Sequence, residues 1–138
     1  MREERGHMRG NLVIDEPYTL WGSIAGDVTA VKGSKFYVRG PIYGSLTVLH
    51  GGRVHVFGNV TGDLVVKDGA KVIHSGVVGG DCVNEGGRLY VDKIAKTLGQ
   101  VRTEDGKTTF EGEPEPKADE EYEPKPDRTP RPRPKPGA

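Results

Sequence analysis

The chain has 138 residues, enough for one domain, and its 20 Lys and Arg residues balance 20 Asp and Glu residues. This zero net charge gives no reason to propose nucleic acid or an acidic substrate as a partner of the whole chain. The single cysteine excludes an intramolecular disulfide framework, and no apolar run suits a secretory signal or a membrane span, so we expect a cytoplasmic protein.

The N-terminal end is charged and has no apolar run, and we predict a flexible tail over residues 1–11. An apolar strand follows at Leu12, Val13 and Ile14. This strand can begin a further coil or pair with a neighbouring molecule, because an unpaired strand edge is a template for another chain. Its three residues are therefore candidates for self-assembly.

Glycines recur at intervals of eighteen residues through the middle of the chain. The phrase GSIAGDV returns as GPIYGSL, GNVTGDL and GVVGGDC, whose first residues are Gly22, Gly40, Gly58 and Gly76. Interior glycines disfavour helices by about 1 kcal/mol each relative to alanine. A fixed period of this kind is typical of a solenoid, in which each repeat buries its apolar face by stacking on its neighbours.

A shorter rhythm of six residues lies inside each repeat. Apolar residues occur at every sixth position from Ile24 to Val78, and Val54-His55-Val56 shows the alternation of a strand. The pattern predicts an all-β fold: a short parallel β-helix with three faces and 18 residues per coil, spanning residues 12–110. Tyr18, Phe36 and Tyr90 are assigned to one inward column. The period itself does not determine the handedness of the helix.

The turn motifs carry the most distinctive wording in the sequence. GxIxGDV, GxVxGDL and GVVGGDC are each followed about seven residues later by a phrase such as GGRV, GAKV or GGRL. This arrangement, over roughly residues 18–91, resembles the bactofilins, which are bacterial polymer-forming cytoskeletal proteins. The resemblance implies a right-handed β-helix that forms nonpolar filaments by end-to-end stacking. The chain departs from the pattern in its short domain, in Ser45, which replaces an acid, and in a degraded coil around Ile94.

Towards the C-terminal end of the domain the inward columns turn polar, at His74, Asn84 and Asp92. We interpret this change as a fading terminal coil, and we take His74, Asn84 and Tyr90 as candidates for the second assembly edge. Residues 93–110 are predicted to fold over this edge as a hairpin around Gly106.

Three outward aromatic residues are predicted to lie close together on the first two coils, namely Trp21, Tyr37 and Tyr43. An exposed aromatic cluster can be a contact surface. We expect it to bind either a lateral partner or the N-terminal arm.

A column of aspartates, Asp27, Asp63 and Asp81, raises the possibility of a cation site between adjacent coils. We favour the simpler interpretation that each Asp hydrogen-bonds its own backbone in a turn. Cys82 falls in an inward column, where a thiol behaves as a small buried hydrophobe. We therefore predict no metal and no cofactor.

The histidines His50, His55 and His74 suggest an alternative in which the protein is an acyltransferase. Hexapeptide-repeat acyltransferases share the six-residue rhythm with some right-handed helices, and they use a histidine as general base. His55 alternates outward and His50 precedes a glycine corner, and the sequence places no acidic partner or extruded loop near either. We therefore expect no catalytic residue and no small-molecule substrate.

The segment 111–138 is predicted to be a disordered tail, because it contains eight of the ten prolines and no Val, Ile, Leu, Phe or Trp. Between Glu111 and Asp127 it has eight acids and two lysines. Its last cations alternate with prolines, which favours a polyproline II rod for docking to an SH3-like groove, an acidic surface or a membrane. The acidic block can pair with this basic end, which argues against nucleic acid. The candidate partner-binding residues of the tail are Arg128, Arg131, Arg133 and Lys135.

Together these features predict a non-enzymatic, bactofilin-like scaffold that forms a homopolymer and recruits partners through its tails. We expect those partners to be cell-envelope or membrane-associated proteins, and we expect this cytoplasmic protein to associate with the inner face of the membrane. Two alternatives remain: a non-polymerising β-helical adaptor that binds one protein partner, and a relative of the hexapeptide-repeat acyltransferases.

Overall fold

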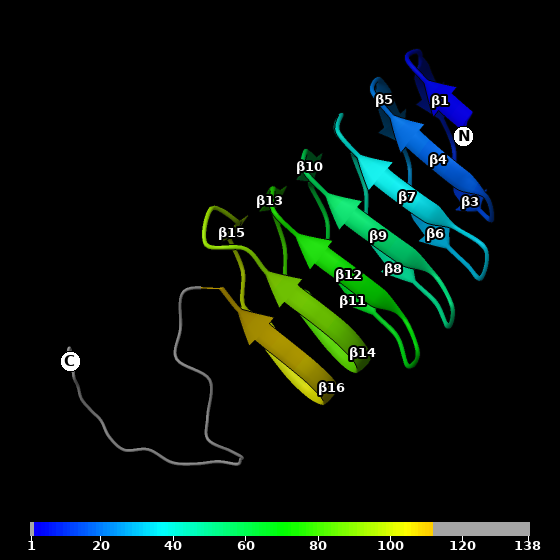
Figure 1. The fold of residues 1–138 in the computed structure, drawn as a ribbon. Coiled ribbons are helices and arrows are strands. Elements are labelled where there is room, and N and C mark those ends of the chain that lie inside the picture. Colours follow the sequence, from blue (N-terminus) through cyan, green and yellow to red (C-terminus); the bar gives the residue numbers. More distant parts are fainter. Residues whose placement is uncertain (1, 112–138) are drawn as a thin grey trace, which may run out of the picture.

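The computed structural model describes residues 2–111, which form a stack of parallel β-strands (Figure 1). The strands wind around three faces in about six turns, so the prediction of an all-β parallel β-helix is confirmed. None of these residues belongs to a helix long and apolar enough to cross a membrane.

Each turn contributes one strand, or one bridge, to each of three faces, which we call faces A, B and C. Face A contains β1 (Arg2–Glu4), β4 (Pro17–Leu20), β7 (Lys35–Val38), β9 (Arg53–Val56) and β12 (Lys71–His74). Face B contains β2 (His7–Arg9), β5 (Ser23–Ala25), a bridge at Ile42, β10 (Asn59–Val60), β13 (Val77–Val78) and β15 (Lys96–Thr97). Face C contains β3 (Leu12–Ile14), β6 (Val28–Ala30), β8 (Leu46–Val48) and β11 (Leu64–Val66). The long strands β14 (Cys82–Val91) and β16 (Val101–Phe110) bend around a corner, so each serves face C first and face A afterwards.

The core is built from the inward columns that the six-residue rhythm predicts. On face A, Phe36 pairs with Val54 and Val54 pairs with Val72, each step being eighteen residues. On face B, Ile42 and Val60 are bridged at the same spacing and are completely buried. Full burial of such side chains contributes roughly 1.5–3 kcal/mol each. Stacking of neighbouring coils is therefore what holds the solenoid together.

The corner glycines are required by this stacking. A Cβ on Gly40 would collide with the backbone carbonyl of Gly22 in the preceding coil, and a Cβ on Gly76 would collide with that of Gly58. The eighteen-residue glycine column is thus explained by close approach of backbone to backbone.

The first coil begins earlier than predicted. Strands β1 and β2 pair in parallel with β4 and β5, so the prediction of a flexible tail is wrong for residues 2–11. The eighteen-residue pattern misses this coil because Arg2 pairs with Tyr18 and Leu12 with Val28, a spacing of sixteen. The corner at Asp15-Glu16 is shorter by two residues than the corner of the next coil, which explains the difference.

The fifth coil is one residue shorter than the coil before it, and this changes the register of the strand that follows. Val72 pairs with Leu89, seventeen residues later, and Leu89 is completely buried. Tyr90 pairs with Ile73 instead and is 40% exposed, so its assignment to the inward column is wrong. Because side chains alternate between the two sides of a strand, a shift of one residue exchanges inward and outward positions.

Residues 96–110 form one more coil of the helix, so the predicted hairpin is wrong. Strand β15 pairs in parallel with β13, and β16 pairs in parallel with β14. Val78 pairs with Thr97, nineteen residues later, because Asp92–Ala95 occupies a corner that has two residues in the coil before. Gly106 forms the last corner with a φ of 81°.

Candidate functional sites

The aspartate column forms a hydrogen-bond ladder between coils. Asp27 Oδ1 accepts a hydrogen bond from the N–H of Ser45 at 2.9 Å, and Ser45 Oγ accepts from the N–H of Asp63 at 3.0 Å. Asp63 Oδ1 accepts from the N–H of Asp81, and Asp81 Oδ1 from that of Gln100. We predicted that each Asp hydrogen-bonds the backbone of its own turn, but the side chains bond the backbone of the next coil instead. A serine suits this ladder as well as an acid does, which accounts for Ser45.

A cation site has no support in this column. Asp81 Oδ2 forms an ion pair with Arg102 at 3.2 Å. Across residues 2–111 no group of three or more His, Cys, Asp or Glu side chains is placed to hold a metal ion.

His74 and Asn84 lie inside the helix, because the last coil covers them. Both side chains are completely buried, so their predicted place at an exposed edge is wrong. His74 Nε2 contacts the carbonyl oxygen of Lys96 and Thr97 Oγ1, both at 3.2 Å, while its Nδ1 has no hydrogen-bond partner. Burial lowers the pKa of His74, so the neutral imidazole is favoured in the fold.

The Asn84 side chain supplies the hydrogen-bond acceptor at the corner of the fifth coil, which is one residue shorter than the corner of the coil before. In the preceding coil the N–H of Ala70 closes the corner on the carbonyl of Lys67. In the fifth coil Asn84 Oδ1 accepts from the N–H groups of Gly86 and Gly87 at 3.1 and 2.9 Å. The Asn84 side chain therefore closes a corner that lacks one residue.

The histidines and the cysteine do not form an activated nucleophile. His55 Nε2 contacts Ser75 Oγ at 3.1 Å, and Ser75 donates to Asp92 Oδ2 at 3.1 Å, a polar chain that the sequence analysis missed. Because the hydroxyl proton points to the carboxylate, the imidazole is not placed to accept it. Burial also raises the pKa of the Cys82 thiol to about 11, which keeps it protonated. His50 lies on the exposed surface at a corner.

The N-terminal end of the helix presents the unpaired edges of β1, β2 and β3. Leu12 is in register with Val28 and half-buried, and Ile14 is buried, so these two candidates face the stacking axis. Val13 is 65% exposed and in register with Thr29, so it points sideways from face C. Half-buried Met8 adds an apolar group from face B.

The face A part of the N-terminal end is charged. Arg2 is in register with Tyr18 and forms an ion pair with Glu16 at 3.7 Å. Glu4, on the same strand as Arg2, is in register with Leu20 of β4. The N-terminal end of the core is therefore apolar on faces B and C, and it carries one cation and one anion on face A.

The C-terminal end presents the unpaired edges of β15 and β16. Val101 continues the inward column of Cys82 and is half-buried, and Phe110 continues that of Val91 and is exposed. Threonines occupy other inward positions, with a hydrogen bond of 2.7 Å between Thr103 and Thr108.

The aromatic candidates divide into two groups. The Arg39 guanidinium lies 5.1 Å from the Trp21 ring and 4.3 Å from the Phe57 ring, and Phe57 stacks with Tyr37 at 6.5 Å. These contacts connect Trp21 and Tyr37 on one side of the helix. The ring contacts found among residues 2–111 do not include exposed Tyr43, which belongs to face B.

Residues of the first coil cover part of Trp21. Its indole Nε1 donates to Glu3 Oε1 at 3.1 Å, and the Arg5 guanidinium lies 5.2 Å from its ring. Of the two expected uses of Trp21, contact with the N-terminal residues is therefore present. Trp21 remains 44% exposed.

The basic candidates of the tail, Arg128, Arg131, Arg133 and Lys135, lie outside the described residues. Comparisons of the chain with protein-family models, curated proteins and solved structures found no match.

Proposed function

We propose that this protein is a bactofilin-like scaffold rather than an enzyme, and that it assembles by end-to-end stacking of its β-helix. The observation that carries the proposal is the open state of both ends. No strand within residues 2–111 pairs with the outer edges of β1, β2 and β3 or of β15 and β16. Unpaired N–H and C=O groups above a partly apolar core are a template for another copy, whereas solenoids that stay monomeric need polar caps.

The charges of the first coil favour contact between like ends. Arg2 and Glu4 are two residues apart on the terminal strand, with their side chains on the same side. If two first coils meet as an antiparallel pair centred on Glu3, Arg2 of each copy lies opposite Glu4 of the other. Opposite charges facing each other stabilise an antiparallel pair. This arrangement agrees with the nonpolar filaments that the sequence resemblance implies.

The assembly is tested by negative-stain electron microscopy and sedimentation velocity of the full-length protein at micromolar concentration and near-physiological salt. We expect filaments a few nanometres wide. Monodisperse particles of the wild-type protein would refute the scaffold function.

Two variants test the two ends separately. Leu12→Lys places a charge on the N-terminal stacking surface, and Val101→Lys places one on the C-terminal surface. For like-end stacking, each single variant should stop at dimers and the double variant should be monomeric. Head-to-tail stacking predicts monomers from each single variant. Val13→Lys is the matched control, because Val13 adjoins Leu12 but points sideways, and it should still form filaments.

A lateral adaptor function is the second candidate, favoured by the exposed rings of Trp21 and Phe57 on either side of Arg39. Such aromatic and arginine side chains are enriched among the residues that dominate protein interfaces. Trp21→Ala should leave filaments intact and remove binding of a lateral partner. Loss of filaments in Trp21→Ala would instead place Trp21 in assembly. Recruitment of envelope proteins by the tail remains part of the proposal.

A further inference from the structure

Five cationic side chains form a straight row along face A. Arg53, Lys71, Arg88 and Lys107 are in register on consecutive strands, and Lys35 occupies the same position one strand earlier. All five are exposed. Strands lie about 4.8 Å apart, so the row is about 19 Å long. We call these five residues the basic row.

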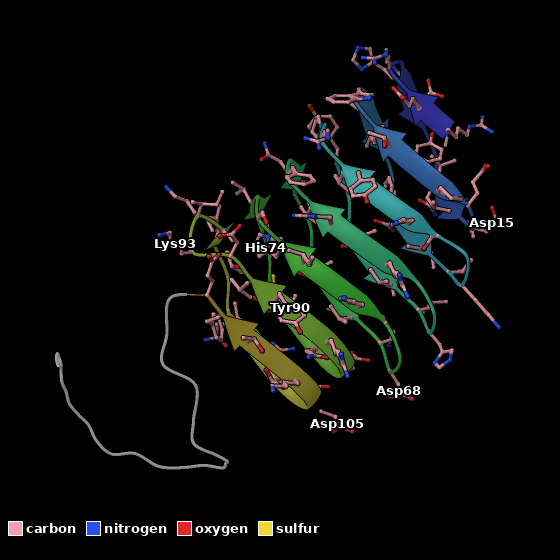
Figure 2. All side chains as sticks on the ribbon, in the orientation of Figure 1. Asp15, Asp68, His74, Tyr90, Lys93 and Asp105 are labelled. Atoms are coloured by element: carbon pink, nitrogen blue, oxygen red, sulfur yellow. The ribbon has the colours of Figure 1, made fainter. Side chains whose placement is uncertain are left out.

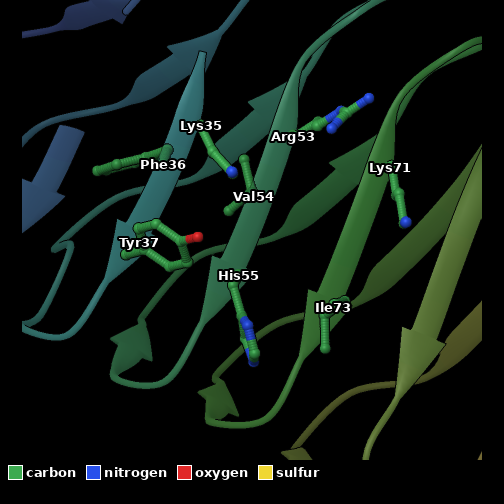
Figure 3. A pocket seen from close by; sticks show the side chains of 8 residues that line it. All are labelled: Lys35, Phe36, Tyr37, Arg53, Val54, His55, Lys71 and Ile73. Atoms are coloured by element: carbon green, nitrogen blue, oxygen red, sulfur yellow. The ribbon is translucent and has the colours of Figure 1, made fainter. Parts of the chain in front are cut away.

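The basic row borders a shallow apolar groove. Figure 3 shows Lys35, Arg53 and Lys71 along one side of this groove, which has a volume of about 150 Å³. The outward residues of the same three strands, Tyr37, His55 and Ile73, also line it.

The charge of the basic row is not neutralised within residues 2–111, where none of its members forms an ion pair. The corner that precedes the row carries four acids, Asp68, Glu85, Glu104 and Asp105; Asp68 and Asp105 are labelled in Figure 2. Glu85 is already paired with Lys67 at 2.7 Å. Glu104 is paired with Arg102 at 3.9 Å. The five cations thus outnumber the four corner carboxylates, of which two are engaged elsewhere.

The geometry of the row suits an extended acidic peptide. One cation per strand along a straight line can pair with carboxylates on an extended chain, whose residues advance about 3.3 Å each. The groove beside the row can take the apolar part of such a chain. The sequence of this protein contains one segment of this composition, residues 111–127, with eight acids and two lysines.

We propose that the basic row binds the acidic segment 111–127 of the same chain. The described chain ends on the same face as the row: Phe110 ends β16, three residues and about 10 Å beyond Lys107, and the N–H of Glu111 donates to the carbonyl of Val91. Residues 112–127 span at most roughly 50 Å when extended, which exceeds the length of the row. The bound segment shields face A from other polyanions. This inference does not depend on end-to-end stacking.

The test measures binding of a synthetic, fluorescein-labelled peptide of residues 111–127 to full-length protein by fluorescence anisotropy. In the wild-type protein the tethered segment, at an effective concentration in the millimolar range, competes with the peptide. A tail-neutral variant removes this competitor, and we expect it to bind the peptide at least about tenfold more tightly if the free affinity is near 0.1 mM. Added salt should weaken this binding. The tail-neutral substitutions are Glu115→Gln, Asp119→Asn, Glu120→Gln, Glu121→Gln and Glu123→Gln.

A second set of substitutions locates the binding site. In the tail-neutral protein, Lys35→Gln, Arg53→Gln and Lys71→Gln should abolish peptide binding. The matched control removes three cations outside the row, by Lys32→Gln, Lys93→Gln and Lys96→Gln, and should retain it. Circular dichroism confirms that each variant is folded.

The inference is overturned if the wild-type and tail-neutral proteins bind the peptide equally, or if the row variant and its control lose binding equally. Binding of phosphatidylserine vesicles or oligo-dT, but not of the peptide, through the row would also overturn it and assign the row to lipid or nucleic acid. If the row variant does not fold, carbodiimide cross-linking of the wild-type protein decides. Cross-links from Lys71 or Lys107 to residues 113–127 support the inference, and their absence contradicts it.

Discussion

The repeat pattern and the observed hydrogen bonds predict opposite effects of the substitution Asn84→Val on stability. Asn84 lies in the inward column of Val48 and Val66, so the pattern predicts that valine improves the core. The structure predicts the opposite, because Asn84 is completely buried and closes the shortened corner at Gly86-Gly87.

The magnitude follows from the groups that lose their partner. The N–H groups of Gly86 and Gly87 lose the Asn84 oxygen, and the carbonyls of Gly87 and Lys107 lose its amide nitrogen, at 3.1 and 3.0 Å. A buried polar group left without a partner costs about 1–3 kcal/mol. Burial of the valine side chain returns about 1.5 kcal/mol. Since Gly86 is only half-buried, we expect Asn84→Val to lower the free energy of unfolding by about 2–4 kcal/mol.

The assay is urea unfolding of the full-length protein followed by far-UV circular dichroism, with the assembly state matched by sedimentation. A loss of this size should lower the urea midpoint by about 1–2 M. Inserting one Asp between Glu85 and Gly86 restores the corner of the preceding coil, Asp68-Gly69, and should recover most of the loss in Asn84→Val. An Asn84→Val protein as stable as wild type would refute the reasoning.

Four further predictions concern the core, the ladder and the two titrating groups. Val60→Ala, at a completely buried position, should cost about 2–3 kcal/mol in urea unfolding, and an unchanged midpoint would contradict the packing. Asp63→Ala should cost about 0.5–1.5 kcal/mol by removing the acceptor for the Asp81 N–H, whereas Asp63→Ser should be nearly neutral. Because the pKa of His74 is lowered in the fold, its contribution to stability is complete above its ordinary value of 6.5 and decreases as the pH falls towards the folded pKa. Urea midpoints measured across this range should therefore fall less in His74→Leu than in wild type. Cys82, with a pKa of about 11, should react with a thiol reagent near pH 8 only after the protein unfolds.

The sequence predicted those parts of the fold in which neighbouring coils have equal length. Where the spacing is eighteen, as from Phe36 to Val54 and Val72, each inward residue repeats the chemistry of the one below it. The basic row follows the same rule at Lys35, Arg53 and Lys71, which are eighteen residues apart. These features could be read because stacking of equal coils places every eighteenth residue in the same environment.

The tertiary structure alone decided the parts in which the coil length changes. A spacing of sixteen residues explains why the eighteen-residue pattern misses the first coil. A spacing of seventeen places Tyr90 on the surface. A spacing of nineteen precedes β15, where the structure has a further coil and the sequence predicted a hairpin. A corner that lacks a residue keeps its backbone hydrogen bonds only through a side chain such as Asn84, a compensation that periodicity does not reveal. The same holds for the ends, where pairing with the next coil determines that Leu12 faces the stack and Val13 faces sideways. Register between strands is a property of their pairing, and one residue more or less at a corner exchanges the two sides of every strand that follows.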